Sequence, residues 1–152
     1  MTIVGCQTIF DVMKTDHLVS LLADVKSKCD RYLIRELKRC GINDLAPSHG
    51  GILNALYNHD KMSMKELSVA IDRDKSTITT LINKLIEIGY IKKSRDAADK
   101  RVFYISLTAK GKKLKPVFDE ISRNISSKFI KDLNIDEQES LVRILEKIKT
   151  TW

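Results

Sequence analysis

One segment of the 152-residue chain carries short polar side chains along a face of a predicted helix. Apolar residues in the segment 75–88 recur at helical spacing and leave the opposite face polar. The polar residues on and beside that face are Lys75, Ser76, Thr77, Thr79, Thr80, Asn83, Lys84 and Glu87. β-Branched residues lower helix propensity by about half a kcal/mol each, so a purely structural surface would favour Glu, Lys and Ala. Hydroxyl and amide groups instead suit contact with phosphates, thymine methyl groups and base edges, although an ordinary solvated face is the alternative.

A second group of candidate residues lies in a polar loop that spans residues 95–101. Asp99 and Arg101 are two positions apart, so on extended backbone they share a face and the carboxylate can orient the guanidinium group. An arginine oriented at a loop tip can enter the minor groove of DNA, where negative potential is concentrated. A surface ion pair that adds little to stability is the alternative.

The net charge of the chain is concentrated in one place. The formal charge is +7, from 27 Lys and Arg residues against 20 Asp and Glu residues. Segment 92–115 holds nine basic residues and two acidic ones, while the rest of the chain carries 18 of each sign. A local excess of this kind is expected of a surface that binds a polyanion, and a solvated charged face is the bland alternative.

Composition excludes several classes of protein. Hydrophobic residues make up 43% and charged residues 31%, with only 6 Gly and 2 Pro, which favours a folded and largely helical chain. No apolar run approaches the roughly 20 residues that cross a bilayer, and the first residues lack the basic region of a signal peptide. We therefore expect a cytoplasmic protein with no membrane partner. Cys6, Cys29 and Cys40 are odd in number and widely spaced, which predicts free thiols rather than a disulfide framework or a zinc ribbon.

A long helix is predicted before these segments. Apolar residues from Leu18 to Leu37 keep helical spacing over about six turns, and Gly41 follows as a plausible stop. Residues 1 to about 14 are poorly patterned and read as a loose extension. So long a stripe needs another helix or another subunit to cover it.

Two shorter helices are predicted to precede the polar one. Ser48 is expected to cap the first. Ser63 begins the second, with Glu66 at the spacing of a capping box. After the turn at residues 72–74, the helix over 75–88 stops at Gly89.

The remainder of the pattern predicts a hairpin followed by helices. Residues 90–93 and 102–107 are rich in β-branched and aromatic side chains and flank the polar loop, as in a hairpin. Thr108 is expected to cap a helix that bends at Pro116 and reaches about Leu133. A last amphipathic helix begins at Asn134 or Asp136. The predicted fold is therefore mainly α (α+β), a winged helix-turn-helix with flanking helices. The wing is the hairpin over residues 90–107, including its polar loop.

The segment 67–111 resembles the DNA-binding core of the multiple antibiotic resistance regulator (MarR) family of bacterial transcription factors. The motifs that carry the resemblance are Asp74-Lys75-Ser76-Thr77-Ile78-Thr79, Leu85-Ile86-Glu87-Ile88-Gly89-Tyr90-Ile91, Arg95-Asp96-Ala97-Ala98-Asp99-Lys100-Arg101 and Leu107-Thr108-Ala109-Lys110-Gly111. With the flanking helices it covers about residues 16–149. The resemblance implies a homodimer with intertwined terminal helices, divided into an extension (1–15), an N-terminal dimerisation helix (16–47), the winged domain (48–108) and C-terminal dimerisation helices (109–152).

The resemblance also implies how DNA would be bound. The residues expected in or beside the major groove are Lys75, Ser76, Thr77, Thr79, Thr80, Asn83 and Lys84. Arg101, braced by Asp99 and helped by Lys100, is expected in the minor groove, and Arg73 is expected to clamp a phosphate. The operator should be a pseudo-palindrome of double-stranded DNA with half-sites about 34 Å apart, bound in a strongly salt-dependent way. By family tendency the protein is expected to be a repressor, of the kind that serves stress responses.

The sequence gives the least information about which signal the protein senses. Members of the family often bind small aromatic acids between the dimerisation helices and the winged domain, and the residues expected near such a pocket are His17, Tyr32, His49 and Tyr57. A structural role is the alternative for each. The helix after the wing lacks the histidine pair of zinc-responsive members, so we expect no metal site and no cofactor. Redox sensing through Cys6 is an alternative.

Two other classes of function compete with the regulator. An enzyme is disfavoured, because the chain has no glycine-rich phosphate loop, no carboxylate cluster with a histidine and no nucleophile motif. A winged helix that only docks another protein is the second alternative, and the basic charge around the wing argues against it. Neutralising Arg101 separates the DNA-binding hypothesis from the docking hypothesis, because a DNA-binding protein should lose affinity for DNA while it remains folded and dimeric.

Overall fold

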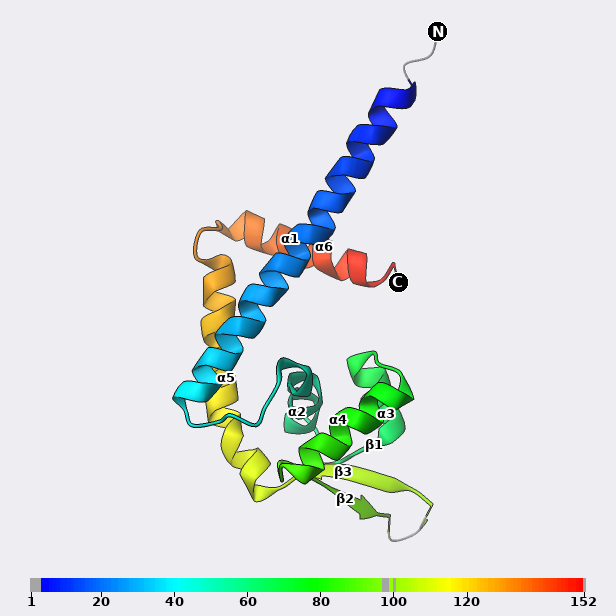
Figure 1. Ribbon diagram of the computed structural model, residues 1–152, viewed down its shortest axis with the longest axis vertical. Helices are drawn as coiled ribbons and strands as arrows, with labels where there is room; N and C mark the ends of the chain where they lie inside the picture. Colours follow the sequence, from blue (N-terminus) through cyan, green and yellow to red (C-terminus); the bar gives the residue numbers. More distant parts are fainter. Residues whose placement is uncertain (1–3, 97–98, 100, 152) are drawn as a thin grey trace. The chain divides into compact units, whose positions relative to one another are not determined.

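The chain folds as a series of helices with one small sheet (Figure 1). The computed structural model describes residues 4–96, 99 and 101–151, with side chains from His17 onward. The elements, in chain order, are α1 (Val4–Arg39), a 3-10 turn η1 (Pro47–His49), α2 (Gly50–Tyr57), β1 (Met62–Ser63), α3 (Met64–Ile71), α4 (Lys75–Glu87), β2 (Ile91–Arg95), β3 (Phe103–Leu107), α5 (Ala109–Ile130) and α6 (Ile135–Lys149). Two compact units result, Met1–Lys113 and Leu114–Trp152.

Helix α1 begins earlier than the sequence pattern predicts. It starts at Val4, so most of the expected loose extension is helical. That segment lacks an apolar stripe but contains no proline, and adding turns to an existing helix is far easier than nucleating one. The predicted stop is confirmed: Gly41 has φ +77°, and the Ile42 N–H donates to the Leu37 carbonyl at 2.9 Å.

The predicted cap at Ser48 is wrong. Ser48 lies inside η1, which begins at Pro47, and α2 starts only at Gly50. The acceptor is the buried His49 instead, because its Nδ1 accepts the Ala46 N–H at 3.1 Å. Proline at the first position of the turn starts the helical geometry too early for the serine hydroxyl to cap it.

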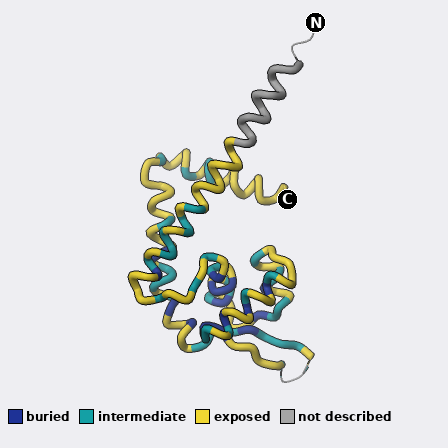
Figure 2. Tube along the Cα trace, in the orientation of Figure 1, coloured by how far each residue is buried: buried dark blue, intermediate teal, exposed yellow. Residues whose placement is uncertain are grey.

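The winged domain has one apolar core under its sheet. The fully buried side chains of this domain are Ile52, Leu53, Leu67, Ile78, Ile82, Leu85, Ile91 and Ile105. They lie on α2, α3, α4, β2 and β3, and Figure 2 shows buried positions gathered in this part of the chain. The predicted hairpin is confirmed, with β2 antiparallel to β3 and Arg95 opposite Phe103. The short strand β1, which the sequence did not indicate, pairs with the other edge of β3.

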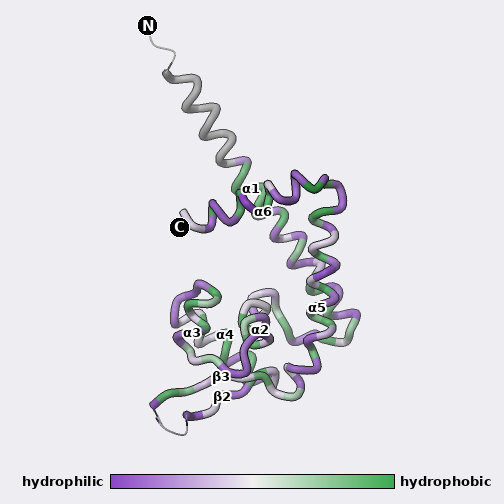
Figure 3. Tube along the Cα trace, turned by 180° about the vertical axis from the view of Figure 1, so that it is seen from behind, coloured by the Kyte–Doolittle hydropathy of each residue, from purple (hydrophilic) through white to green (hydrophobic). Residues whose placement is uncertain are grey.

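The second unit contains most of α5 and all of α6. Helix α5 continues through Pro116 and ends at Ile130, three residues before the predicted end. Of the two predicted starts of α6, Asn134 is confirmed, and it caps the helix in a capping box with Glu137. Figure 3 shows hydrophobic positions recurring along α6. Most of its large apolar side chains are exposed, Val142 by 56% and Ile144 by 49%.

Candidate nucleic-acid interface

The turn between α3 and α4 is built from side-chain hydrogen bonds. Asp72 adopts the left-handed conformation at φ +48°, which aspartate tolerates better than most residues. The Ser68 hydroxyl donates to the Arg73 carbonyl at 2.6 Å and ties the turn back to α3. The exposed Arg73 side chain therefore projects from a fixed backbone position.

Asp74 caps α4 and fixes its first turn. One carboxylate oxygen accepts the backbone N–H groups of Ser76 and Thr77, each at 2.9 Å, and the other accepts the Thr77 hydroxyl at 2.6 Å. Hydrogen bonds from Ser76 and Thr77 hold the pKa of the Asp74 carboxyl well below its ordinary value. The cap is therefore ionised at any pH near neutrality.

The polar face of α4 is exposed as predicted, while Ile78, Ile82 and Leu85 are buried beneath it. The Thr79 hydroxyl donates to the Lys75 carbonyl at 2.7 Å, and the Thr80 hydroxyl donates to the Ser76 carbonyl at 3.1 Å. Because these hydroxyl protons are engaged, the two threonines offer oxygen lone pairs and methyl groups outward.

The predicted pairing in the wing is confirmed. Arg101 Nε lies 3.2 Å from Asp99 Oδ1, and the Arg101 backbone N–H donates to the same oxygen at 2.9 Å. The hydrogen bonds from Arg101 lower the pKa of the Asp99 carboxyl. The Arg101 side chain is nevertheless 92% exposed, so it is oriented without being covered. Lys100, the third predicted residue, lies outside the described residues.

Two cations that sequence reasoning did not single out flank Phe103 at the base of the wing. Lys93 Nζ lies 4.2 Å and Arg95 Cζ lies 5.2 Å from the centre of its ring. The strand register places both on the face of the sheet that carries Phe103. Alternation along residues 91–95 was the signal that could have found them, since every second residue of a strand shares a face. Both head groups remain exposed.

The four residues predicted to bind an effector have different environments. His17 is exposed on α1, and Tyr32, half-buried on the same helix, has the Arg35 guanidinium 5.0 Å from its ring centre. His49 serves as the acceptor for Ala46, and burial lowers the pKa of its imidazole, as does the nearby Lys84 charge. The Tyr57 hydroxyl donates to the Gly111 carbonyl at 3.2 Å. His49 and Tyr57 thus have structural roles, whatever else they contact.

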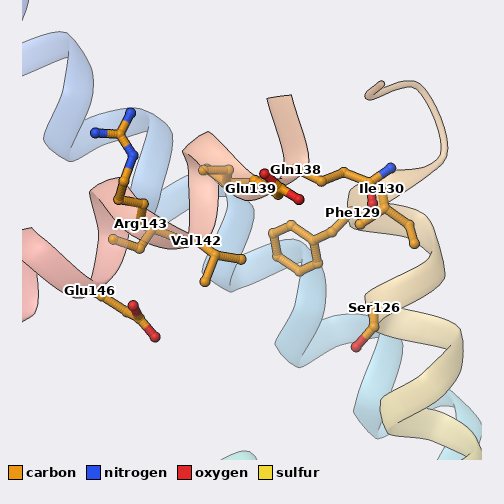
Figure 4. A pocket seen from close by; sticks show the side chains of 10 residues that line it. Ser126, Phe129, Ile130, Gln138, Glu139, Val142, Arg143 and Glu146 are labelled. Carbon is orange, nitrogen blue, oxygen red and sulfur yellow. The ribbon is translucent and has the colours of Figure 1, made fainter. Parts of the chain in front are cut away.

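A groove of about 750 Å³ lies within the second unit, between the end of α5 and α6 (Figure 4). None of the four predicted effector residues lines it. Its apolar lining consists of Phe129, Ile130, Leu141, Val142 and Leu145. Phe129 and Ile130 are more than two-fifths exposed, so the groove opens an apolar surface to solvent.

The part of the chain that the structure describes contains neither a candidate metal site nor a candidate membrane-spanning helix. Within residues 4–96, 99 and 101–151, no three His, Cys, Asp or Glu residues cluster in a way that could hold a metal ion. In the same residues no helix combines the length and the apolar character needed to span a bilayer.

A capped polar helix, a tight turn before it and a basic hairpin after it define a winged helix-turn-helix protein, as the sequence predicts. The family model for the transcriptional regulator SarA/Rot matches residues 44–121. The chain belongs to this SarA/Rot family of DNA-binding transcriptional regulators, whose winged helix is of the MarR type.

Individual relatives support this assignment. The chain is 31% identical to the HTH-type transcriptional regulator SarZ of Staphylococcus haemolyticus over 70% of its length and 71% of the relative's. It is 33% identical to SarZ of Staphylococcus saprophyticus, over 62% of this chain and 64% of the relative.

Solved structures share the fold. The MepR–DNA complex of S. aureus has a TM-score of 0.79 at 23% identity, covering 88% of this chain and 97% of that one. A MarR transcriptional regulator from Methanosarcina mazei Go1 has a TM-score of 0.75 at 23% identity, covering 90% and 96%.

Proposed function

We propose that the protein is a homodimeric repressor that binds a pseudo-palindromic operator in a sequence-specific manner. One observation carries the proposal: the segment with all the excess positive charge, 92–115, contains Arg101, an exposed guanidinium group that Asp99 holds in one orientation. In this reading the acidic residue pre-orients the arginine for a narrow, strongly negative minor groove. Lys100 is proposed to help Arg101 in this contact. A bacterial protein of this kind works in the cytoplasm, on the nucleoid, and its activity is binding rather than catalysis.

Helix α4 is proposed to read the major groove. The residues assigned to this contact are Lys75, Ser76, Thr77, Thr79, Thr80, Asn83 and Lys84. Outward methyl groups and lone pairs on Thr79 and Thr80 suit thymine methyl groups and the amino groups of adenine or cytosine. Asn83 suits a bidentate contact with adenine. Arg73, beside the cap of α4, would contact a phosphate and so set register rather than specificity.

A homodimer would cover the apolar surface that one chain leaves exposed. On α1 the exposed apolar residues are Leu18, Val19, Leu21, Leu22 and Val25. On α6 they are Ile135, Val142, Ile144, Leu145 and Ile148. Soluble monomers rarely expose apolar patches of this extent. A substitution of Val142→Glu should therefore yield monomers in sedimentation equilibrium, while Lys149→Gln, an exposed change on the same helix, should leave the dimer intact.

A small aromatic acid is the proposed effector that relieves repression. The support is a relative in fold: a structure with a TM-score of 0.73 and 21% identity is described as showing regulation of DNA binding of Bordetella bronchiseptica BpsR by 6-hydroxynicotinic acid. The residues assigned to the effector are His17, Tyr32, His49 and Tyr57. Titration of a protein–DNA complex with 6-hydroxynicotinic acid or salicylate should release the DNA if the effector belongs to this class.

Selection from a random duplex library tests the proposal. Purified protein should enrich a palindrome whose half-site centres lie about one helical turn apart, and its affinity should fall steeply with salt. Arg101→Ala should lose affinity for the enriched duplex, whereas the control Arg123→Ala, which removes an exposed charge from α5, should not. Enrichment of no sequence by a folded dimer would contradict specific binding. Docking of another protein through the wing would then be the better reading.

A further inference from the structure

Three segments of the first unit meet at the side chain of Asp44. This residue lies in the loop between α1 and η1. Its Oδ1 accepts a hydrogen bond from the Tyr90 hydroxyl at 3.0 Å, and its Oδ2 accepts one from Lys110 Nζ at 2.9 Å. Tyr90 follows the C-terminus of α4, and Lys110 is in the first turn of α5. One carboxylate therefore connects the end of α1 to the end of the proposed recognition helix.

Lys110 also caps α4 directly. Its Nζ donates to the Ile88 carbonyl at 2.7 Å and lies 4.1 Å from the centre of the Tyr90 ring. A cation at this position satisfies a free carbonyl at the helix end and interacts favourably with the helix dipole. The ammonium group thus binds a carboxylate, a helix terminus and an aromatic face at once.

The connection between α4 and α5 does not depend on Asp44. The Thr108 hydroxyl donates to the Gly89 carbonyl at 2.6 Å, and the Thr108 N–H donates to the Tyr90 carbonyl at 3.0 Å. A Cβ at Gly111 would clash with the Tyr90 carbonyl oxygen, so the two backbones are in close contact. These contacts join α4 to α5 but do not reach the loop that follows α1.

The loop itself is anchored to α1. The Ile42 N–H closes the end of that helix on Leu37, so only Asn43 separates the closed helix end from Asp44. A short, anchored connection transmits the position of α1 to the carboxylate. Tyr90 and Asp44 are in the protonation states that the contact needs: burial and the Asp44 contact raise the pKa of Tyr90 to about 12, while the bonds from Lys110 and Tyr90 outweigh burial and lower the pKa of Asp44.

We propose that Asp44 is a positioning residue, which sets the orientation of α4 relative to α1 through Tyr90 and Lys110 and thereby the half-site spacing that the dimer accepts. The inference rests on the proposed function, in which α1 belongs to the dimer and α4 reads the DNA. Adding one base pair between the half-sites increases the distance between their centres by about 3.4 Å and rotates one half-site relative to the other about the DNA axis. If Asp44 holds α4 in place, the dimer should bind a duplex with the altered spacing much more weakly. If α4 is held loosely, the affinity should change little with spacing.

The side chains of Asp44 and Lys110 are 37% and 50% exposed, so the ion pair contributes little to stability. Loss of the carboxylate also leaves the hydroxyl of the buried Tyr90 without this acceptor, so the melting temperature should fall modestly while the protein stays a folded dimer. The spacing preference separates a positioning role from a structural one, because a structural role would weaken binding to every duplex alike.

The test compares duplexes that differ only in spacing. The enriched duplex and two derivatives, with one base pair inserted or removed at the symmetry centre, are titrated with wild type, Asp44→Ala, Asp44→Asn and the control Asp60→Ala, an exposed acid of the same unit. Asp44→Ala should reduce the preference for the original spacing by about fivefold or more, roughly 1 kcal/mol. Asp44→Asn, which keeps an acceptor for Tyr90, should restore part of it, and Asp60→Ala should match wild type.

A wild-type spacing preference in Asp44→Ala would overturn the inference, even if the overall affinity fell. Should Asp44→Ala fold poorly, Tyr90→Phe replaces it, because this change removes the hydroxyl and keeps the buried ring; an unchanged preference there overturns the inference equally. Failure of wild type to prefer any duplex would instead contradict the proposed function, together with the inference built on it.

Discussion

Arg101 is bound by the carboxylate of Asp99 through its backbone and its side chain at once. The backbone N–H and Nε both donate to Oδ1, at 2.9 and 3.2 Å, and a terminal guanidinium nitrogen reaches Oδ2 at 3.4 Å. The shared oxygen couples the direction of the guanidinium group to the backbone of the wing. Since the arginine side chain is 92% exposed, the pair orients a charge toward solvent and does not fill a core.

Removing either partner should weaken DNA binding to different extents. Arg101→Ala should lower affinity for the enriched duplex by about tenfold to a hundredfold, the cost of one specific arginine contact. Asp99→Ala should cost less, because the charge remains and only its orientation is lost. Fluorescence anisotropy measures both affinities, and the melting temperature should stay unchanged. Equal losses for the two variants would argue against orientation by Asp99.

The cations beside Phe103 are expected to contact phosphates. Lys93→Gln and Arg95→Gln should each reduce the slope of log affinity against log salt by about 1, with similar effects on all duplexes. Lys38→Gln, on the exposed surface of α1, serves as the control and should leave the slope unchanged. Sequence-dependent losses in the Lys93 or Arg95 variants would show that these residues read bases instead.

The junction at Gly111 should be intolerant of any side chain. Gly111→Ala would drive a methyl group into the Tyr90 carbonyl oxygen and should lower the free energy of unfolding by about 1–3 kcal/mol, as overpacked cores do. The matched control is Gly51→Ala, where the new Cβ would meet Ile71 at an ordinary 3.5 Å. Urea denaturation at fixed protein concentration compares the two. Equal stability of the two variants would contradict the tight contact.

His49 should make stability depend on pH. Its imidazole pKa is lowered, mainly by burial and also by the Lys84 charge, so below the ordinary value of about 6.5 the unfolded chain binds a proton that the folded chain resists. Stability should therefore rise with pH as the medium passes from about pH 5.5 to neutrality. His49→Asn keeps an acceptor for Ala46 and should flatten this part of the profile. An unchanged slope in the variant would assign the dependence to other groups.

Local pattern was enough to predict the parts of the fold that local physics determines. The glycines that close helices, the capping box at Ser63 and the core stripe of α4 depend on neighbours within four residues. The Asp99–Arg101 contact is predictable for the same reason. The predicted cap at Ser48 was wrong because proline and serine both occur at helix starts. In the structure the 3-10 turn begins at Pro47, so Ser48 lies inside it.

Other features depend on contacts far apart in the sequence. Asp44 and Tyr90 are 46 residues apart, and nothing in either local pattern points to the other. The pairing of β1 with β3 is equally remote, and its two residues carry no strand pattern of their own. The cations beside Phe103 were counted in the basic segment, but their contact with the ring follows only from the strand register.

Whether α4 and the wing read a DNA sequence is decided by a ratio of two affinities. The enriched duplex and a shuffled duplex of the same composition are titrated at one salt concentration with the wild-type dimer. We expect the enriched duplex to bind about a thousandfold more tightly or better, as for specific DNA-binding proteins. A ratio near one, from a dimer that still binds both duplexes, would contradict sequence reading and leave only electrostatic attraction to the backbone.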